Sequence, residues 1–168
     1  MTWAWMLGPV SSAAPGGPGA LFIAFVLFLC LLVVVDWVRE HNRRAGLRAL
    51  AARRGFSYLG ASLPKSFTLG GTPFAAATEV WSVLDADCNG VRVICFDCRV
   101  GSGKGSWRRT VIAAKATPLV FSHTMSPPLA VDQCGEWSFM YEPRRMSFIP
   151  GWPMGVSEIE SHLDAIRR

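Results

Sequence analysis

The sequence predicts an α+β protein with one N-terminal transmembrane helix, and three observations carry this prediction. A run without charge or proline extends from Leu21 to Val35. The middle of the chain alternates between β-prone stretches and glycine-rich turns, as antiparallel sheets do. The last residues repeat their apolar side chains with a helical period. We therefore expect an extracytoplasmic tail over residues 1–19, a transmembrane helix over 20–38, a basic juxtamembrane helix over 39–55, and over 56–168 a small antiparallel-sheet domain with a C-terminal amphipathic helix.

Length and composition limit the chain to one membrane helix and one folded core. It has 168 residues, of which 51% are hydrophobic and 17% charged. General disorder is excluded, because disordered chains combine low hydrophobicity with high net charge.

The formal charge of +5 is concentrated in one segment. Six arginines and a single acidic residue lie between Trp37 and Arg54, and basic and acidic residues balance elsewhere. Such a cluster faces lipid headgroups when it follows an apolar run, and the balanced remainder disfavours nucleic-acid binding. The alternative is a topology signal and solvated linker only. The residues that we expect at the membrane surface are Trp37, Arg39, Arg43, Arg44, Arg48, Arg53 and Arg54.

The apolar run is long enough to cross a bilayer once. Residues 20–38 would span about 28 Å as a helix, close to the thickness of the hydrocarbon core. A cleavable signal peptide is the rival, but residues 1–19 carry no lysine or arginine. Because positive residues stay on the cytoplasmic side, we expect a single-pass membrane protein with the N-terminus outside and the C-terminal domain in the cytoplasm.

Beyond the span, the alanine, leucine and arginine content predicts that the helix continues to Gly55, which is suited to cap it. Phe56 to Leu59 form a short apolar stretch, and the segment from there to Phe74 is expected to be loop, because it is rich in glycine and proline.

The clearest strand signal is a hairpin around Asn89 and Gly90. Asn-Gly between two β-prone runs, 79–86 and 91–100, predicts a tight turn, and a third strand over 107–116 follows the turn from Gly101 to Ser106. Residues 136–142 alternate so that Trp137, Phe139 and Tyr141 share one face, and 146–149 is a candidate partner strand. We expect five or six strands in all.

A terminal helix closes the chain. Ser157 and Glu160 match a capping box, and the apolar face comprises Val156, Ile159, Leu163 and Ile166. His162 is expected on the polar side of this helix.

The turn Gly101–Ser106 resembles a phosphate-binding loop only superficially. The first glycine of that motif is replaced by Cys98, and Gly105 stands where serine or threonine should follow Lys104. A flexible hairpin turn is the interpretation that we prefer. A contact surface for a partner remains open, made of Lys104, Trp107, Arg108 and Arg109.

The cysteines and histidines do not form a recognisable site. Cys30 lies in the span, and Cys88, Cys95, Cys98 and Cys134 could supply zinc ligands by number. Cys95 and Cys98, however, are three residues apart in a predicted strand and point to opposite faces, so we expect buried hydrophobes rather than a metal centre.

The residue types of a hydrolytic triad are present in Ser122, His123 and Asp132, but the glycine-flanked serine that would expose a nucleophile is absent. We assign no catalytic, cofactor-binding or metal-binding residue from the sequence.

The run GVRVICFDCR from Gly90 to Arg99, the glycine-rich turn and the segment from Thr110 to Ala114 together resemble uncharacterised bacterial membrane proteins. The resemblance implies an N-terminal helix, an arginine-rich stalk and a small cytosolic domain. It brings no assigned activity.

Three functions are compatible with these features. The first is a noncatalytic accessory or scaffold subunit, whose cytosolic domain docks on a larger respiratory, photosynthetic or transport complex in the bilayer. The alternative is a membrane-tethered ligand-binding or sensing module with a pocket between sheet and terminal helix. The third is a hydrolase, which would need His123 or a cysteine beside a partner in a cleft.

Overall fold

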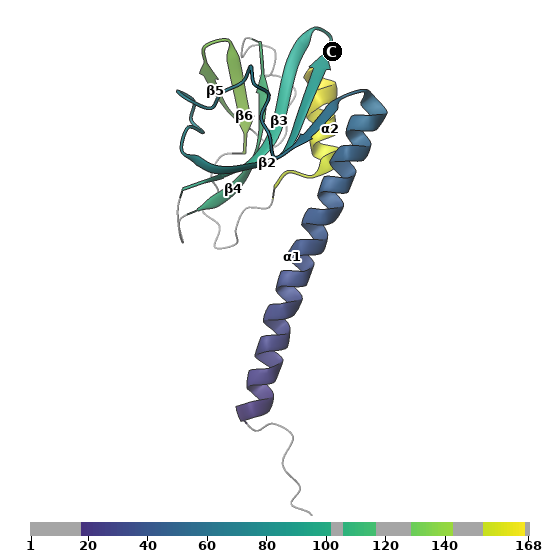
Figure 1. Cartoon of the computed structure of the whole chain (residues 1–168), viewed down its shortest axis with the longest axis vertical. Helices are drawn as coiled ribbons and strands as arrows, with labels where there is room; N and C mark the ends of the chain where they lie inside the picture. The colour runs from purple at the N-terminus through teal and green to yellow at the C-terminus, as the bar shows by residue number, and fades with distance from the viewer. Residues whose placement is uncertain (1–17, 102–105, 117–128, 143–152, 167–168) are drawn as a thin grey trace, which may run out of the picture. The chain divides into compact units, whose positions relative to one another are not determined.

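The computed structural model describes residues 18–101, 106–116, 129–142 and 153–166 (Figure 1). It divides into two compact units, Met1–His41 and Asn42–Arg168, which we call the N-terminal unit and the domain. The elements are α1 (Pro18–Arg54), β1 (Ser57–Gly60), β2 (Ala77–Cys88), β3 (Val91–Val100), β4 (Trp107–Ala114), β5 (Ala130–Cys134), β6 (Trp137–Tyr141) and α2 (Val156–Ile166). The predicted α+β class, with a long apolar N-terminal helix and a terminal helix, is confirmed.

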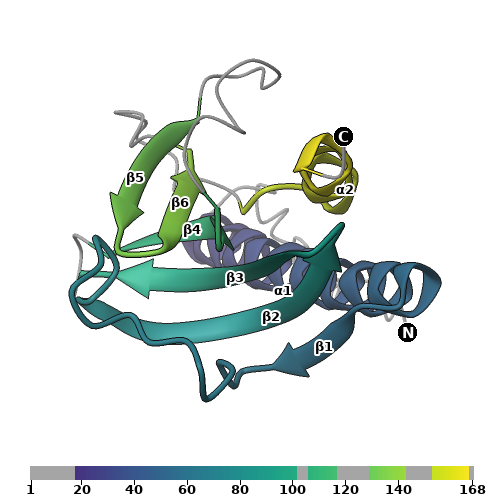
Figure 2. The same cartoon turned by 90° about the horizontal axis from the view of Figure 1, so that it is seen from above.

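The six strands form one antiparallel sheet in the order β1-β2-β3-β4-β6-β5 (Figure 2). The predicted hairpin joins β2 to β3, where Cys88 pairs with Val91. Asn89 and Gly90 have φ angles of 57° and 81°, as a type I′ turn requires. Asparagine and glycine tolerate this left-handed conformation best, which explains why these residues mark the turn.

Strands β1 and β5 are the elements that the sequence analysis missed, and β1 forms from the short apolar stretch after Gly55, for which no strand was predicted. Strand β5 pairs with β6 along its whole length, from Ala130 opposite Tyr141 to Cys134 opposite Trp137. The segment 146–149, which we expected beside β6, lies outside the described residues. The sequence of β5, AVDQC, does not alternate between apolar and polar residues, so no period of two reveals the strand.

One face of the sheet is covered by helices. Leu47, Leu50 and Ala51 of α1 and the apolar face of α2 pack on side chains from the sheet in one buried cluster. The sheet residues of this cluster include Leu84, Cys95, Ile112 and Met140. The predicted apolar face of α2 is therefore confirmed, because Ile159, Leu163 and Ile166 are all buried there.

The opposite face is covered by the segment between β1 and β2. Phe67 and Phe74 from this segment pack on Phe96 and Phe139, with ring centroids 5.9 to 6.4 Å apart. Trp137 joins this second cluster beside Phe67. The predicted shared face of β6 is thus confirmed.

Helix α1 ends where the glycine predicts. Gly55 has a φ angle of 73°, and the Phe56 N–H donates to the Ala51 carbonyl oxygen at 2.9 Å. This bond is the 6→1 contact of a Schellman motif, with glycine at the left-handed position.

Two expectations about α2 are wrong. The helix begins at Val156, so Ser157 lies inside the first turn, and the Glu160 carboxylate binds arginines instead of capping the helix. His162 is buried among the core residues rather than facing solvent. Position 162 adjoins the apolar face formed by Ile159, Leu163 and Ile166, which draws it into the core.

Candidate functional site

The N-terminal unit exposes a continuous apolar surface. Every large hydrophobic side chain of α1 from Leu21 to Val38 is at least 39% exposed, and Leu21 is 69% exposed. Within the described part of the chain, α1 is the single helix long and apolar enough to cross a membrane. Trp37 is also exposed, and it stacks on His41 with ring centroids 5.5 Å apart.

The six arginines that follow the apolar run differ in exposure. Arg39, Arg44, Arg48 and Arg53 are exposed, whereas Arg43 and Arg54 are partly buried. Three of the six bind carboxylates of the domain: Arg43 binds Asp97, Arg53 binds Glu160, and Arg54 binds Glu160 and Asp164. The expectation that all six face lipid is therefore corrected for Arg43, whose side chain is only 11% exposed.

Arg43 enters a buried polar cluster on the helix-covered face of the sheet. Its guanidinium makes two bonds to the carboxylate of Asp97, one of them from Nη2 to Oδ1 at 3.0 Å. Thr110, the cross-strand neighbour of Asp97, donates its hydroxyl to Asp97 Oδ1 at 2.8 Å and accepts from Arg43 Nη2 at 3.2 Å. The bidentate geometry matches a guanidinium to a carboxylate and makes each hydrogen bond charge-assisted.

The same cluster reaches the segment that leads into α2. Arg43 Nε donates to the Met154 carbonyl oxygen at 3.0 Å, and the Met154 N–H donates to Thr110 Oγ1 at 2.9 Å. Four parts of the domain, namely α1, β3, β4 and the residues before α2, thus meet at one charged pair. Because Asp97 is only 1% exposed, its charge depends on Arg43 for compensation.

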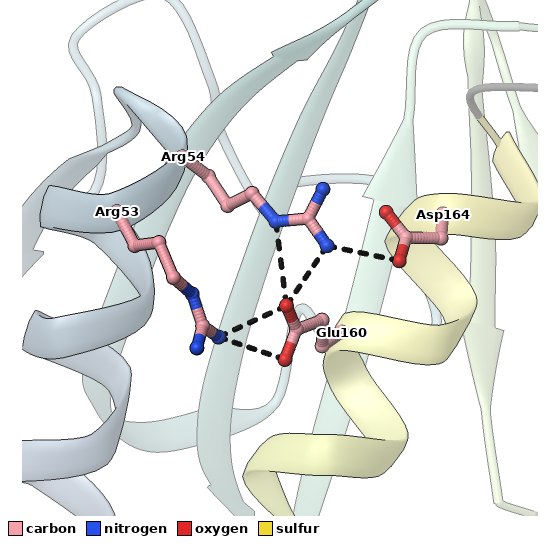
Figure 3. Close-up of polar contacts among 4 residues, drawn as sticks. All are labelled: Arg53, Arg54, Glu160 and Asp164. Carbon is pink, nitrogen blue, oxygen red and sulfur yellow. Dashed lines mark hydrogen bonds and ion pairs between the residues drawn. The ribbon is translucent and has the colours of Figure 1, made fainter.

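A second set of ion pairs links the end of α1 to α2 (Figure 3). Arg53 Nη2 lies 2.9 Å from both oxygens of Glu160, while Arg54 Nη2 lies 2.9 Å from Glu160 Oε1 and 3.0 Å from Asp164 Oδ2. The hydrogen bond from Arg54 holds the pKa of the Glu160 carboxyl below its usual value. These side chains are partly to largely exposed, so water screens the pairs more than it screens the Arg43 pair.

The residues proposed for partner contact are separated by the strand. Trp107 and Arg109 share one face of β4, with the Arg109 guanidinium carbon 3.7 Å from the Trp107 ring centroid and 5.0 Å from that of Tyr141. Arg108 points to the other face, 5.8 Å from the Trp81 ring. The alternation of β4 therefore prevents Arg108 and Arg109 from forming one patch. Lys104 lies outside the described residues.

The Trp107, Arg109 and Tyr141 group, which we call the arginine–aromatic cluster, is extended by an acid. The Tyr141 hydroxyl donates to Asp132 Oδ2. Burial, followed by this hydrogen bond, raises the pKa of Tyr141. Asp132 is thus engaged with a tyrosine. Ser122 and His123, the other residue types of a hydrolytic triad, lie outside the described residues.

The thiols of β3 are placed as the alternation predicts. Cys95 belongs to the helix-covered cluster and Cys98 to the aromatic cluster on the opposite face. Burial raises the pKa of both thiols to about 12, so they stay protonated at neutral pH. No group of three metal-binding side chains occurs among the residues with described positions.

His162 is the buried titratable group that the sequence analysis misplaced. Its side chain is 5% exposed, and its Nε2 atom has no hydrogen-bond partner in the described structure. Burial lowers its pKa, while Glu158 and Glu142 act in the opposite direction.

Asp97 was missed although a signal for it exists in the sequence. It lies on the same face of β3 as Val93 and Cys95, both apolar, so its carboxylate is expected to enter the core. A charged residue in that position requires a buried cation, and only the tertiary structure identifies Arg43 as that cation.

No protein-family model, no curated protein and no solved structure matches this chain. Its function is therefore inferred from the contacts of its own residues.

Proposed function

We propose that this chain is a noncatalytic, single-pass membrane protein that serves as an accessory or scaffold subunit of a larger assembly in a bacterial inner membrane. The observation that carries the proposal is the exposed apolar surface of α1 between Leu21 and Val38. A surface of this kind is unfavourable in water and is stabilised by lipid. Membrane insertion accounts for it directly.

The direction of insertion follows from the arginines. Topology is set while the chain is inserted, so all six arginines after the apolar run act at that stage, including those that later bind carboxylates. Their position favours an N-terminus outside the cell and a domain in the cytoplasm.

Docking on another protein subunit is supported by the arginine–aromatic cluster. Tryptophan, tyrosine and arginine are the side chains that most often dominate binding energy at protein interfaces. Arg109 is held by the rings of Trp107 and Tyr141, so less side-chain entropy would be lost when a partner binds. The partner that we propose is a protein subunit of a respiratory, photosynthetic or transport complex.

Membrane insertion is tested by extraction and by a reporter fused after Arg168. We expect the full chain to stay in the membrane fraction after alkaline extraction and the reporter to be active in the cytoplasm. A reporter active only in the periplasm, or mature protein that lacks its first 38 residues, would overturn the proposal.

Docking is tested by chemical crosslinking of the full chain in native membranes, followed by mass spectrometry. Arg109→Gln should lose the specific neighbour that the wild-type chain crosslinks. Arg108→Gln is the matched control, because it removes the same charge from the adjacent residue on the other face of β4 and should keep that neighbour. A wild-type chain that crosslinks to nothing and purifies as an 18.3 kDa monomer in detergent contradicts docking.

A further inference from the structure

The sheet has two edge strands, β1 and β5 (Figure 2). In an antiparallel edge strand, alternate residues direct their backbone N–H and C=O groups away from the sheet. An extended chain can pair with such groups and continue the sheet. The two edges of this sheet differ in how well they permit that pairing.

Strand β1 is protected against the addition of a strand. It has four residues, and its pairing with β2 shifts in register between Tyr58 and Gly60, where the φ angle of Gly60 is 70°. The Arg48 guanidinium carbon lies 5.3 Å from the centroid of the Tyr58 ring, so a charge stands beside this strand. Short length, irregular pairing and charge are features by which natural sheets prevent edge-to-edge pairing.

Strand β5 lacks these forms of protection. Its five residues keep a regular register with β6, and its sequence, AVDQC, contains neither lysine nor proline. Within the described part of the chain, β5 pairs on one side only. Val131 is 40% exposed, although its cross-strand partner Met140 is buried. Strand β5 is therefore the edge suited to receive another strand.

We infer that β5 binds an extended segment of the partner subunit, which continues the sheet by one strand. The inference rests on the docking proposed above and identifies the binding mode and the chemistry of the partner segment. Strand β5 adjoins the arginine–aromatic cluster, because the Tyr141 hydroxyl donates to Asp132 Oδ2. In strand addition, backbone hydrogen bonds supply affinity and alternate side chains supply specificity.

The side chains of β5 specify the chemistry of that segment. Val131 lies on the helix-covered face with Met140, and Asp132 lies on the opposite face with Phe139. Asp132 is the one charged residue of β5. A complementary strand therefore presents an apolar side chain opposite Val131 and a lysine or arginine opposite Asp132, since cross-strand pairs of these kinds are stabilising.

A second copy of this chain is a poorer occupant of the edge. Strand β5 has no basic residue to place opposite Asp132. A two-fold pair of β5 strands centred on Asp132 would set the two carboxylates directly opposite each other, which is destabilising. A pair centred on Val131 would place each Asp132 opposite an alanine, Ala130, and would leave the charge without a complement. The occupant is therefore a segment of a different protein.

The test maps the contacts of β5 by photocrosslinking of the full chain in native membranes. The photoreactive amino acid p-benzoylphenylalanine replaces either Val131 or Gln133, which are exposed on the same face of β5. Both positions should crosslink to one partner subunit, and mass spectrometry should place the two attachment sites two residues apart in its sequence. This step is the signature of paired strands. The residue between the two sites, opposite Asp132, should be lysine or arginine.

The variant Val131→Lys, with the photoreactive residue at position 133, should lower the crosslinked fraction at least about fivefold, because lysine protects an edge and removes the apolar contact. Leu59→Lys is the matched control, since Leu59 is 37% exposed on the other edge strand. It should change the fraction by less than about twofold. Val131→Thr keeps the β-branched shape and should retain most of the crosslinking. Thermal unfolding of the full chain shows whether each variant folds as the wild type does.

The outcomes separate strand addition from its alternatives. Crosslinks to a second copy of this chain, attachment sites without the two-residue step, or equal losses in Val131→Lys and Leu59→Lys would overturn the inference. A partner segment without a basic residue opposite Asp132 would refute the chemistry assigned to it. Failure of the docking proposal gives a different result, because the wild-type chain then has no specific neighbour in chemical crosslinking. A neighbour that Arg109→Gln loses, together with no crosslink from β5, would leave docking in place and refute strand addition.

Discussion

Helix α1 contains two stretches of similar side chains in opposite environments. Leu31, in the N-terminal unit, is 58% exposed, while Leu47 and Leu50, in the domain, are each 1% exposed. The arginines differ in the same way, since Arg43 is enclosed by the core and Arg44 beside it is exposed. Residue type and helical conformation therefore do not decide whether a side chain of α1 is buried. The neighbouring elements of the fold decide it.

The largest effect should come from the buried ion pair. Asp97→Ala leaves the Arg43 charge uncompensated, and we expect a loss of about 3–5 kcal/mol in the free energy of unfolding. Denaturant unfolding of the full chain in detergent measures it. The double variant Arg43→Met/Asp97→Leu, which removes both charges, should recover much of this loss. A loss below about 1 kcal/mol would place the pair among screened surface contacts and would erase the contrast between Arg43 and Arg44.

The two leucine environments can be compared directly. Leu50→Ala should cost about 2–5 kcal/mol because it opens a cavity between α1 and the sheet. Leu31→Ala should change the unfolding free energy of the domain by less than about 0.5 kcal/mol, since its side chain lies outside that core. Similar losses in both variants would show that the two stretches are not energetically distinct.

The end of α1 should respond more weakly. Gly55→Ala places a β-carbon on a residue with a φ angle of 73°, and we expect a cost of about 1–2 kcal/mol. Nothing lies within 4 Å of the added carbon, so the cost is conformational and not steric. Gly19→Ala, at the other end of α1 with equal space, is the control and should not destabilise the domain. If Gly55→Ala is neutral, the glycine is not required to end the helix.

The smallest effect at neutral pH concerns His162. Burial lowers its pKa in the folded state, so protonation favours unfolding. The contribution of neutral His162 to the free energy of unfolding is complete above its unfolded pKa of about 6.5. This contribution is lost as the pH falls below that value. Urea unfolding at pH 7.5 and pH 5.5 should show a decrease for wild type that His162→Gln does not share. Glu160, whose pKa is also lowered, loses its contribution only below about its ordinary value of 4.5. Parallel decreases in wild type and variant would exclude His162 as the cause.

Much of the fold was predictable because its signals are local. Asn89 and Gly90 mark a turn by their own backbone preferences, and Gly55 does the same at the end of α1. The opposite placement of Cys95 and Cys98 followed from the period of a strand. Strands β1 and β5 were not predicted, because β1 has four residues and β5 lacks an alternating pattern. Each pairs with a neighbouring strand, β1 with β2 and β5 with β6, and no local pattern records that pairing.

The candidate sites were less predictable. From the sequence we located the cationic segment, but we assigned one role to all of its arginines. We also placed Arg108 and Arg109 in one contact surface, although their side chains lie on opposite faces of β4. Asp97 lies 54 residues from Arg43, and Glu160 lies 107 and 106 residues from Arg53 and Arg54, separations across which charge alone does not identify partners.

The sequence by itself determined the apolar run, the density of arginines behind it, the hairpin and the amphipathic terminal helix, because each depends on residues that are neighbours in the chain. The tertiary structure alone decided which charges are buried together, which arginines stay exposed and on which face each aromatic ring lies. These depend on distances between elements, and electrostatic and packing energies are set by distance and burial rather than by order along the chain.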